Sequence, residues 1–317
     1  MNKNFLFFPL KFIVSAALIW FLISNFELGS AVDRYDNINY LYIFGAVLIF
    51  AALLFNNTVR WMIVLNAIYT NLSFGKAFKI LWISYFFNQT LPSTIGGDAY
   101  KIYLVRKTGI ELKSAITGVM LERAVAFLGL IFLVILSQPF LLARIEDDPA
   151  KYIFPLLAVM SMSGIIALLL LDRLPKRLQA MTIIRGLLHL ASDAKRLFLS
   201  PQHASKAIIL GISGNILIAM LAYFTFCALS VDVSILDCLV LIPPVILFIT
   251  LPISIAGWGV REGAMVGAFA LVGVLEGDAF VVSVLFGLLN IIFSLPGGLL
   301  WLLGDYNRAE VVNEVNH

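Results

Sequence analysis

Charged residues, cysteine and histidine are scarce in this 317-residue chain, and each shortage excludes a class of protein. Only 13% of the residues are charged and 61% are hydrophobic, whereas soluble domains carry about 25% charged residues. A soluble enzyme is therefore excluded. A disordered chain is excluded too, because no tract of low hydrophobicity is left. The two cysteines, Cys227 and Cys238, lack CxxC spacing and are expected to be packing residues.

Motifs of catalysis and cofactor binding are also missing. The three histidines, at 189, 203 and 317, form no ligand pair, so no metal site is expected. The sequence has no GxSxG nucleophile motif and no GxxxxGK[ST] loop, and GWGVREG at 257–263 departs from GxGxxG. We expect no cofactor and no ATP-driven step. The net charge of +3 matters only through its distribution along the chain, and no nucleic-acid partner is expected.

Apolar runs long enough to span a bilayer recur along the chain, since a spanning helix needs roughly 20 apolar residues. The uninterrupted runs are 8–24, 40–59, 114–142, 152–171, 207–229 and 279–303. Two further stretches, 80–97 and 239–275, are broken by proline, glycine and polar residues. The expected fold is an all-α polytopic membrane protein with about six to eight crossings.

The distribution of lysine and arginine predicts the orientation, because these residues stay on the cytoplasmic side. Lys3 and Lys11 precede the first run and an acidic loop, 25–39, follows it, so the N-terminus is expected in the cytoplasm, with the chain in the cell inner membrane. The stretch 80–97 has basic residues on both flanks: Arg60, Lys76 and Lys79 before it, and Lys101, Arg106, Lys107 and Lys113 after it. A segment whose flanks share one side cannot cross, which predicts a re-entrant hairpin.

A basic region divides the chain into three parts. Residues 172–206 carry seven lysines and arginines and are expected to be cytoplasmic. Apolar residues recur there at helical spacing: Leu178, Met181, Ile184, Leu188, Ala191, Ala194 and Phe198. This pattern predicts an interfacial helix that anchors to anionic lipid or captures the substrate. The first membrane half is then 1–171, with the broken segment 80–97, and the second is 207–317, with the broken segment 239–262.

The two broken segments contain an internal repeat. Residues 90–101 read TLPSTIGGDAYK and residues 250–261 read TLPISIAGWGVR, and nine of the twelve positions agree in identity or kind. The offset is about half the chain, which indicates two copies of one membrane unit. The acidic loop at 230–238 suggests that the second segment enters from outside. The two copies would then form an inverted repeat, as in many transporters.

The repeated motif predicts an anion site. Pro92 and Pro252 interrupt a helix, and freed backbone groups at membrane depth must line a polar cavity or be buried in protein. Helices that restart after Gly97 and Gly259 would offer N-terminal amides to an anion such as a phosphate, with Lys101 or Arg261 nearby. The alternative is a pair of packing kinks whose cations reach the membrane surface.

Four ionisable residues lie in or beside apolar runs. Glu122 and Arg123 fall inside 114–142, and Arg261 and Glu262 follow the second motif. A charge at the bilayer centre costs about 2.5–3.5 kcal/mol, so each is expected to pair elsewhere or to face a cavity. Asp98 could carry a coupling proton, but capping of the restarting helix is favoured.

The motifs resemble a known family. LPSTIGGDAYKIYLVRKTG, LERA at 121–124 and LPISIAGWGVREG look like the signatures of the transmembrane flippase region of lysylphosphatidylglycerol synthases. The resemblance implies an inner-membrane protein that moves a lipid with a polar head between leaflets. Synthase members add a soluble aminoacyl-transferase domain. The present chain ends at His317 and is not expected to attach lysine to lipid. Phospholipids and polyprenyl-linked lipids are both open as substrates, and so is a homo-oligomer.

Together these features predict a lipid flippase or transporter rather than an enzyme. The expected substrate-binding residues are Asn88, Gln89, Thr94, Gly96, Gly97, Asp98, Lys101, Glu122, Arg123, Gly257, Arg261 and Glu262. One alternative is a lipid-modifying enzyme or an accessory subunit of one, with Glu122 or Asp98 as general base. Another is a scaffold that recruits partners through 172–206.

Overall fold

The computed structural model describes residues 38–90, 96–142, 159, 163, 182–250 and 257–304, and within these ranges it is all-helical. The helices are α3 (Tyr40–Ala67), α4 (Phe74–Thr90), α5 (Gly96–Lys107), α6 (Leu112–Leu142), α9 (Thr182–Phe198), α10 (Pro201–Ala228), α11 (Ile235–Thr250), α12 (Val260–Ala270) and α13 (Glu276–Leu303). The predicted run 8–24 lies outside the described residues, as do Pro92, Thr94 and Pro252, and of the predicted run 152–171 only 159 and 163 are described.

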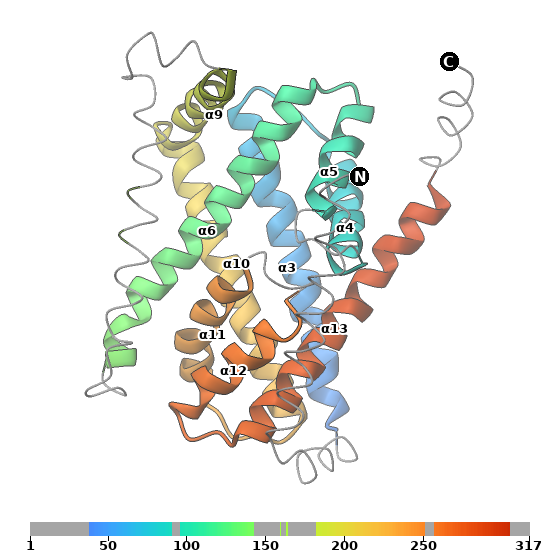
Figure 1. The fold of residues 1–317 in the computed structure, drawn as a ribbon. Coiled ribbons are helices and arrows are strands. Elements are labelled where there is room, and N and C mark those ends of the chain that lie inside the picture. Colours follow the sequence, from blue (N-terminus) through green and yellow to red (C-terminus); the bar gives the residue numbers. More distant parts are fainter. Residues whose placement is uncertain are drawn as a thin grey trace, which may run out of the picture.

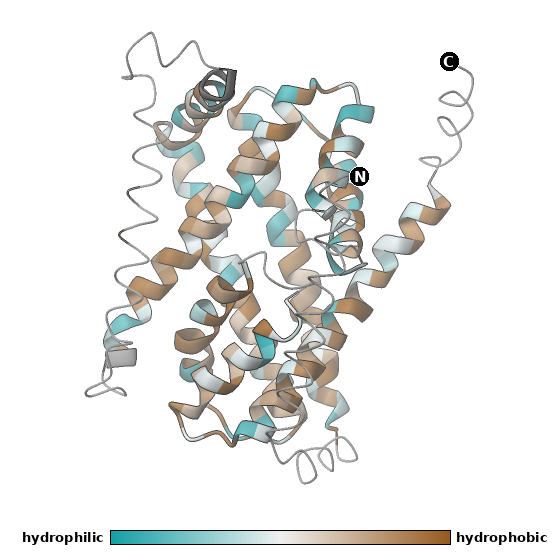
Figure 2. Cartoon of the chain, in the orientation of Figure 1, coloured by the Kyte–Doolittle hydropathy of each residue, from teal (hydrophilic) through white to brown (hydrophobic). Residues whose placement is uncertain are grey.

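Four helices of the described part, α3, α6, α10 and α13, are long and apolar enough to cross a membrane. They correspond to four of the runs expected from the sequence. Figure 2 shows that hydrophilic positions interrupt these hydrophobic helices partway along their length as well as near their ends. Polar groups are therefore present inside the bundle.

The apolar run 40–59 was expected to end before Arg60, and this boundary was wrong. Arg60 was assigned to a cytoplasmic connection, but α3 continues to Ala67, and Arg60 is buried within it. The reason is that an apolar segment, WMIVLNA, follows Arg60 and extends the helix by two turns. A single buried cation was thus mistaken for the end of a span.

Helices α3 and α10 run antiparallel at the centre of the molecule, and the others surround them (Figure 1). Helix α4 packs on α13, and α11 packs on α6. In Figure 1 the pair α4 and α5 occupies the upper half, whereas the pair α11 and α12 occupies the lower half. In the described residues α4 ends at Thr90 and α5 begins at Gly96, and α11 ends at Thr250 and α12 begins at Val260.

The chain after α3 and the chain after α10 turn in the same way. Tyr69 has φ 57° and Ser230 has φ 56°. The next amide bonds back in both cases: Thr70 N–H donates to the Leu65 carbonyl, and Val231 N–H donates to the Phe226 carbonyl. Tyr40 and Pro201, the first residues of the two helices, differ by the same 161 positions as Tyr69 and Ser230.

Helix α9 confirms the helix expected in the basic region. Its apolar residues Leu190, Ala191, Ala194 and Leu197 are buried, and they lie against α3, α6 and α10. Arg196 pairs with Asp193 at 2.9 Å and lies over the ring of Tyr69. The buried part of the apolar face is thus covered by the bundle itself.

Candidate functional site

Three helices bring five ionisable side chains together beside a cavity: Arg60, Asp98, Lys101, Glu122 and Arg123, called here the charged cluster. The Glu122 carboxylate is at its centre. One oxygen accepts from Arg60 Nη2 at 2.5 Å, and the other accepts from Lys101 Nζ at 3.3 Å. The side chains of Arg60 and Lys101 are only 6% and 2% exposed. Both cations are therefore held away from solvent by one carboxylate.

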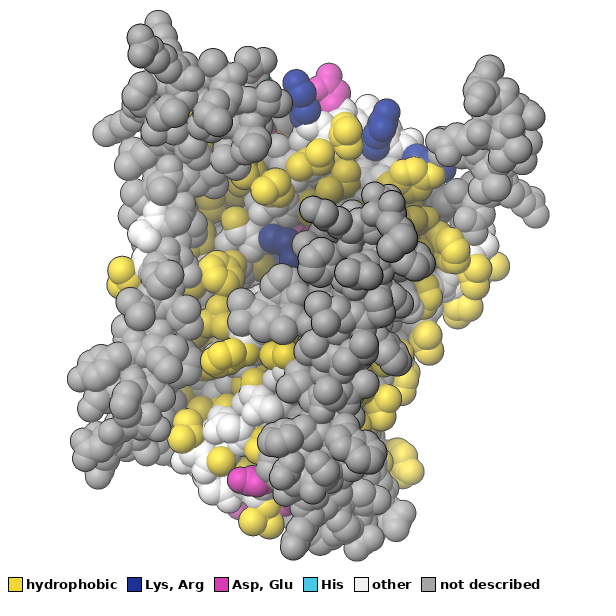
Figure 3. All heavy atoms as spheres, viewed as in Figure 1, with side chains coloured by type: hydrophobic (Ala, Val, Ile, Leu, Met, Phe, Trp, Pro, Cys, Tyr) yellow, Lys and Arg dark blue, Asp and Glu magenta, His cyan; other side chains and the backbone are white. Residues whose placement is uncertain are grey.

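Asp98 forms the third ion pair of the cluster, with Arg123. The two neighbours Glu122 and Arg123 thus point to different partners, as their adjacent positions on α6 require. Arg123 differs from the other cations because 48% of its side chain is exposed. On the face drawn in Figure 3, lysine or arginine side chains appear at mid-height among hydrophobic ones, besides those near the upper end.

The charged cluster has one positive charge in excess among the described residues, since three cations face two carboxylates. Two buried donors, Arg60 Nε and Trp61 Nε1, have no hydrogen-bond partner within the described part of the chain. The Lys101 ammonium also lies over the Trp61 ring, 4.0 Å from its centroid. Buried unpaired donors cost free energy, so this cluster is suited to receive an anion.

The cavity beside the cluster has a volume of about 510 Å³, within the roughly 300–1,000 Å³ of ligand pockets. Its polar wall is completed by Ser84, Tyr85, Asn88, Asn215 and Thr250. The rest of its lining is apolar and includes Phe127, Leu130, Ile218 and Ile246. A charged group and a hydrocarbon chain therefore both find matching surfaces in it.

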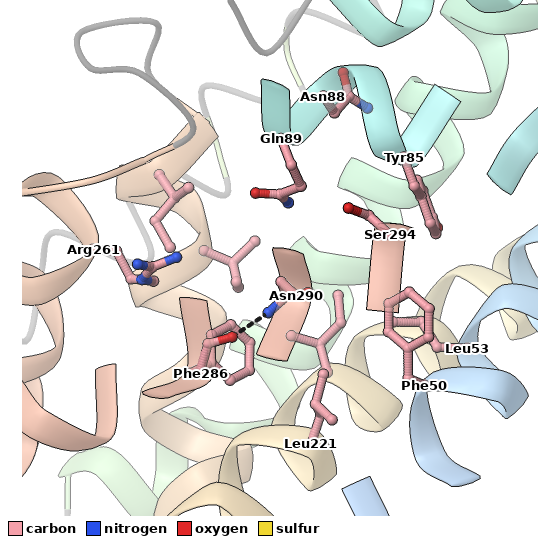
Figure 4. A pocket seen from close by; sticks show the side chains of 13 residues that line it. Phe50, Leu53, Tyr85, Asn88, Gln89, Leu221, Arg261, Phe286, Asn290 and Ser294 are labelled. Carbon is pink, nitrogen blue, oxygen red and sulfur yellow. Dashed lines mark hydrogen bonds between the residues drawn. The ribbon is translucent and has the colours of Figure 1, made fainter. Parts of the chain in front are cut away.

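A second cavity of about 250 Å³ adjoins the first. Tyr85, Asn88, Ile218 and Ile246 line both cavities, so these side chains are the boundary between them. Figure 4 shows the Gln89 carboxamide and the Arg261 guanidinium pointing into this cavity from different sides, with Asn290 and Ser294 beside them. Its remaining wall is apolar, including Phe50 and Phe286. The two cavities are therefore neighbours inside the bundle, each with polar and apolar lining.

Arg261 lines the second cavity, as expected, but Glu262 pairs with its own neighbour Arg261, which corrects the expectation that it pairs elsewhere or faces a cavity. The Glu262 carboxylate accepts from Arg261 Nη2 at 2.6 Å and from Nε at 3.0 Å, and also from the backbone N–H of Gly259. Glu262 is fully buried and lines neither cavity, so its predicted contact with substrate is not supported. The reason is that its carboxylate folds back over the first turn of α12.

The guanidinium of Arg261 needs the glycine at 287. A Cβ atom at Gly287 would lie 2.1 Å from Arg261 Nη2, so a larger residue there would displace the guanidinium. The Arg261 side chain also lies over the Trp258 ring, with 4.6 Å between the guanidinium carbon and the centroid. Helix α13 thus leaves a space that positions this cation at the cavity.

The starts of α5 and α12 are separated by a different number of residues than the two copies of the sequence motif. Helix α5 begins at Gly96 and α12 at Val260, 164 positions later, and the positive-φ glycines Gly109 and Gly273 keep this offset. The repeated motif has an offset of 160. The second connection is therefore four residues longer. Lys101 and Arg261, matched in the motif, do not occupy equivalent positions in the two helices.

In the structural register Asp98 corresponds to Glu262, and Arg123 corresponds to Gly287. Each acid in the first turn of its helix binds a guanidinium. In the first half the guanidinium is that of Arg123 on the next helix, α6. In the second half it is that of Arg261, which precedes Glu262 on α12. The positions of Arg60, Lys101 and Glu122 are taken by Leu221, Met265 and Phe286 in the second half. The charged cluster thus belongs to one half alone.

The residues predicted from the motif fall into two groups. Those that line a cavity are Asn88, Gln89, Asp98, Lys101, Glu122, Arg123 and Arg261. Gly96, Gly97 and Gly257 line neither cavity. Gly97 allows α5 to pack closely on α4, and Gly257 has a positive φ of 82°. Asp98 was expected to cap α5, but it pairs with Arg123, and the Gly97 N–H donates to Asn88 Oδ1 at 3.1 Å.

Sequence reasoning missed several cavity residues. They are Arg60, Ser84, Tyr85, Asn215, Asn290 and Ser294, together with Trp61 under Lys101. A signal existed for Arg60, because Asn56, Asn57, Thr58 and Arg60 are clustered within a helix that is otherwise largely apolar. The hydroxyl of Tyr85, which accepts from Asn57 Nδ2, had none.

Replacement of Gly97 by alanine is expected to lower stability. Its Cβ would lie 2.2 Å from the backbone oxygen of Ser84, so α5 must move away from α4. We expect a loss of about 1–3 kcal/mol, seen as a lower melting temperature in detergent. Gly267→Ala is the control, since nothing lies within 4 Å of its Cβ position. Equal melting temperatures for the two variants would contradict the close packing of α4 and α5.

The comparison with protein families gives one match. A family model described as the lysylphosphatidylglycerol synthase TM region matches residues 9–298. No curated protein and no solved structure matches the chain. The match covers both broken segments and the charged cluster.

Proposed function

The chain belongs to the lysylphosphatidylglycerol synthase TM region family, and on this basis we propose that it moves a lipid with an anionic, phosphate-containing headgroup between the leaflets of the cell inner membrane. Membership of this family implies a function that involves membrane lipid. The observation that carries the proposal is the charged cluster, with its excess positive charge beside a cavity of about 510 Å³. Arginine and lysine side chains form strong, charge-assisted hydrogen bonds with phosphate.

The arrangement of helices supports two inverted copies of one unit. Helices α3 to α6 and α10 to α13 follow the same order of long, short, short and long. A two-fold axis between the copies would require each first short helix to pack on the last long helix of the other copy. The contacts agree with this, because α4 packs on α13 and α11 packs on α6. In Figure 1 the two short pairs enter from opposite ends. Such repeats underlie many transporters.

The short pairs have the lengths of re-entrant hairpins. At 1.5 Å per residue, the 17 residues of α4 extend about 26 Å, and the 12 residues of α5 about 18 Å. The hydrocarbon core is about 30 Å thick, so neither helix crosses it alone. We propose that α4 and α5 enter from the cytoplasmic side, with the N-terminus in the cytoplasm, and that α11 and α12 enter from outside.

The mechanism we propose keeps the acyl chains in the bilayer. Arg123, half exposed, contacts the headgroup first, and the buried Arg60 and Lys101 hold it at the cavity. Small movements of the two hairpins past one another would then open the joined cavities to either leaflet in turn. No chemical bond is made or broken.

Catalysis is less well supported. An enzyme would need a carboxylate free to act as base, and Glu122 and Asp98 were the two candidates. Both of its oxygens are engaged by cations, Arg60 and Lys101, and Asp98 is engaged by Arg123. Each carboxylate is thus occupied by a cation rather than free to take a proton from a substrate. We therefore propose a transporter without catalytic activity.

A leaflet-exchange assay tests the proposal. The purified protein is reconstituted in vesicles with a trace of phosphatidylglycerol that carries a fluorophore on one acyl chain, and a membrane-impermeant reductant is added outside. Without protein, only the outer-leaflet label is expected to be quenched quickly. With protein, the inner-leaflet label is expected to follow. Equal protection with and without protein would reject lipid transport.

A further inference from the structure

The polar chemistry of the two cavities is divided, and the division points to a class of headgroup. All ionisable residues of the charged cluster line the larger cavity. Among the described residues that line the smaller cavity, Arg261 alone is charged, and Glu262 neutralises it from behind. One cavity thus carries an excess positive charge, and the other has uncharged polar groups around a neutralised cation.

The larger cavity matches a single negative charge. The excess over the two carboxylates is one positive charge, so a monoanion makes the occupied cluster neutral. A second negative charge would remain uncompensated inside the bilayer, where charges are costly. A phosphodiester has one charge near neutral pH, whereas a phosphomonoester approaches two. The charge balance therefore favours a diester.

The smaller cavity matches hydroxyl groups. Its polar wall has the carboxamides of Asn88, Gln89 and Asn290 and the hydroxyls of Tyr85 and Ser294. Carboxamides and hydroxyls both donate and accept hydrogen bonds, as a headgroup hydroxyl does. An ammonium group needs acceptors only, and it would lie close to the Arg261 guanidinium. No acidic residue is present among the described residues that line this cavity to offset that repulsion.

We propose that the substrate is a phosphodiester lipid whose headgroup beyond the phosphate is uncharged and bears hydroxyls. The phosphate binds the charged cluster, and the hydroxyl-bearing part enters the smaller cavity past Tyr85 and Asn88, which line both cavities. The tails leave on the side of the half-exposed Arg123. This inference rests on the proposed transport function and adds the substrate class. Lipids with a cationic headgroup or a terminal phosphate are then poor substrates.

The test compares three lipids that share one labelled acyl chain in the exchange assay: phosphatidylglycerol, phosphatidic acid and phosphatidylcholine. We expect phosphatidylglycerol to exchange faster than either of the others by roughly tenfold or more, because each of the others leaves a charge uncompensated inside the bundle. Gln89→Met keeps the shape of the side chain but loses its hydrogen bonds. It is expected to bring the rates of phosphatidylglycerol and phosphatidic acid close to each other.

The possible results distinguish the transport function from the proposed substrate class. Equal rates for all three lipids, well above empty vesicles, would uphold transport and overturn the substrate class. Fastest exchange of phosphatidylcholine or phosphatidic acid would overturn it as well. An unchanged preference in Gln89→Met would overturn the assignment of the smaller cavity to the hydroxyl-bearing part. No exchange of any lipid above empty vesicles would overturn the transport function and this inference together.

Discussion

Glu122→Ala is expected to be the most destabilising substitution in the described part of the chain. The carboxylate binds Arg60 and Lys101, whose side chains are 6% and 2% exposed, and its removal leaves both cations without a counter-ion. Loss of one partner of a buried ion pair costs about 3–5 kcal/mol. The variant should melt at a clearly lower temperature in detergent, or fail to be recovered folded.

Glu111→Ala is the matched control. Glu111 is exposed at the start of α6, and its loss should cost about 1 kcal/mol or less. The double variant Lys101→Met with Glu122→Gln removes a cation together with the carboxylate. It should therefore be more stable than Glu122→Gln alone, and a cycle of these variants gives the coupling between the two residues. Equal melting temperatures for Glu122→Ala and Glu111→Ala would contradict the role of the carboxylate.

Arg123→Gln is expected to have the largest effect on transport with a small effect on folding. The side chain is 48% exposed, so the fold depends on it less than on Lys101. Its loss removes the excess positive charge of the cluster. One charge-assisted hydrogen bond contributes about 1.5–3 kcal/mol, so the exchange rate of phosphatidylglycerol should fall roughly tenfold or more.

Two further variants separate charge from contact. Asp98→Asn combined with Arg123→Gln restores the excess charge, because it removes one acid and one cation. Exchange by this double variant should recover in part. Arg106→Gln, at an exposed position of α5, should exchange at the wild-type rate. If Arg123→Gln exchanges as fast as Arg106→Gln, Arg123 does not contact the headgroup.

The sequence was sufficient to predict much of the fold. Apolar runs predicted α3, α6, α10 and α13, and the repeated TLP motif predicted where the helices are interrupted. The motif also pointed to Asn88, Gln89 and Lys101, which line the cavities. These features depend on local patterns of hydrophobicity, proline and glycine, which are visible along the chain.

The rest depends on contacts between distant segments. The Arg60 and Glu122 pair joins residues 62 positions apart, so nothing near Arg60 indicated its partner. The register of α12 depends on the length of the connection before it, and four extra residues shift Arg261 by about one helical turn relative to Lys101. Similarity of sequence therefore suggested two equivalent cations, whereas the structure holds them in different ways.

Obstruction of the joined cavities tests the route of the headgroup most directly. Ile246 lines both cavities, and Ile246→Trp would fill the space between them. Ile292→Trp is the control, because this isoleucine is 54% exposed on α13. With both variants folded and reconstituted equally, the rate of phosphatidylglycerol exchange is measured. We expect Ile246→Trp to reduce exchange to the level of empty vesicles and Ile292→Trp to retain the wild-type rate. Exchange by Ile246→Trp at the wild-type rate would contradict a headgroup path through these cavities.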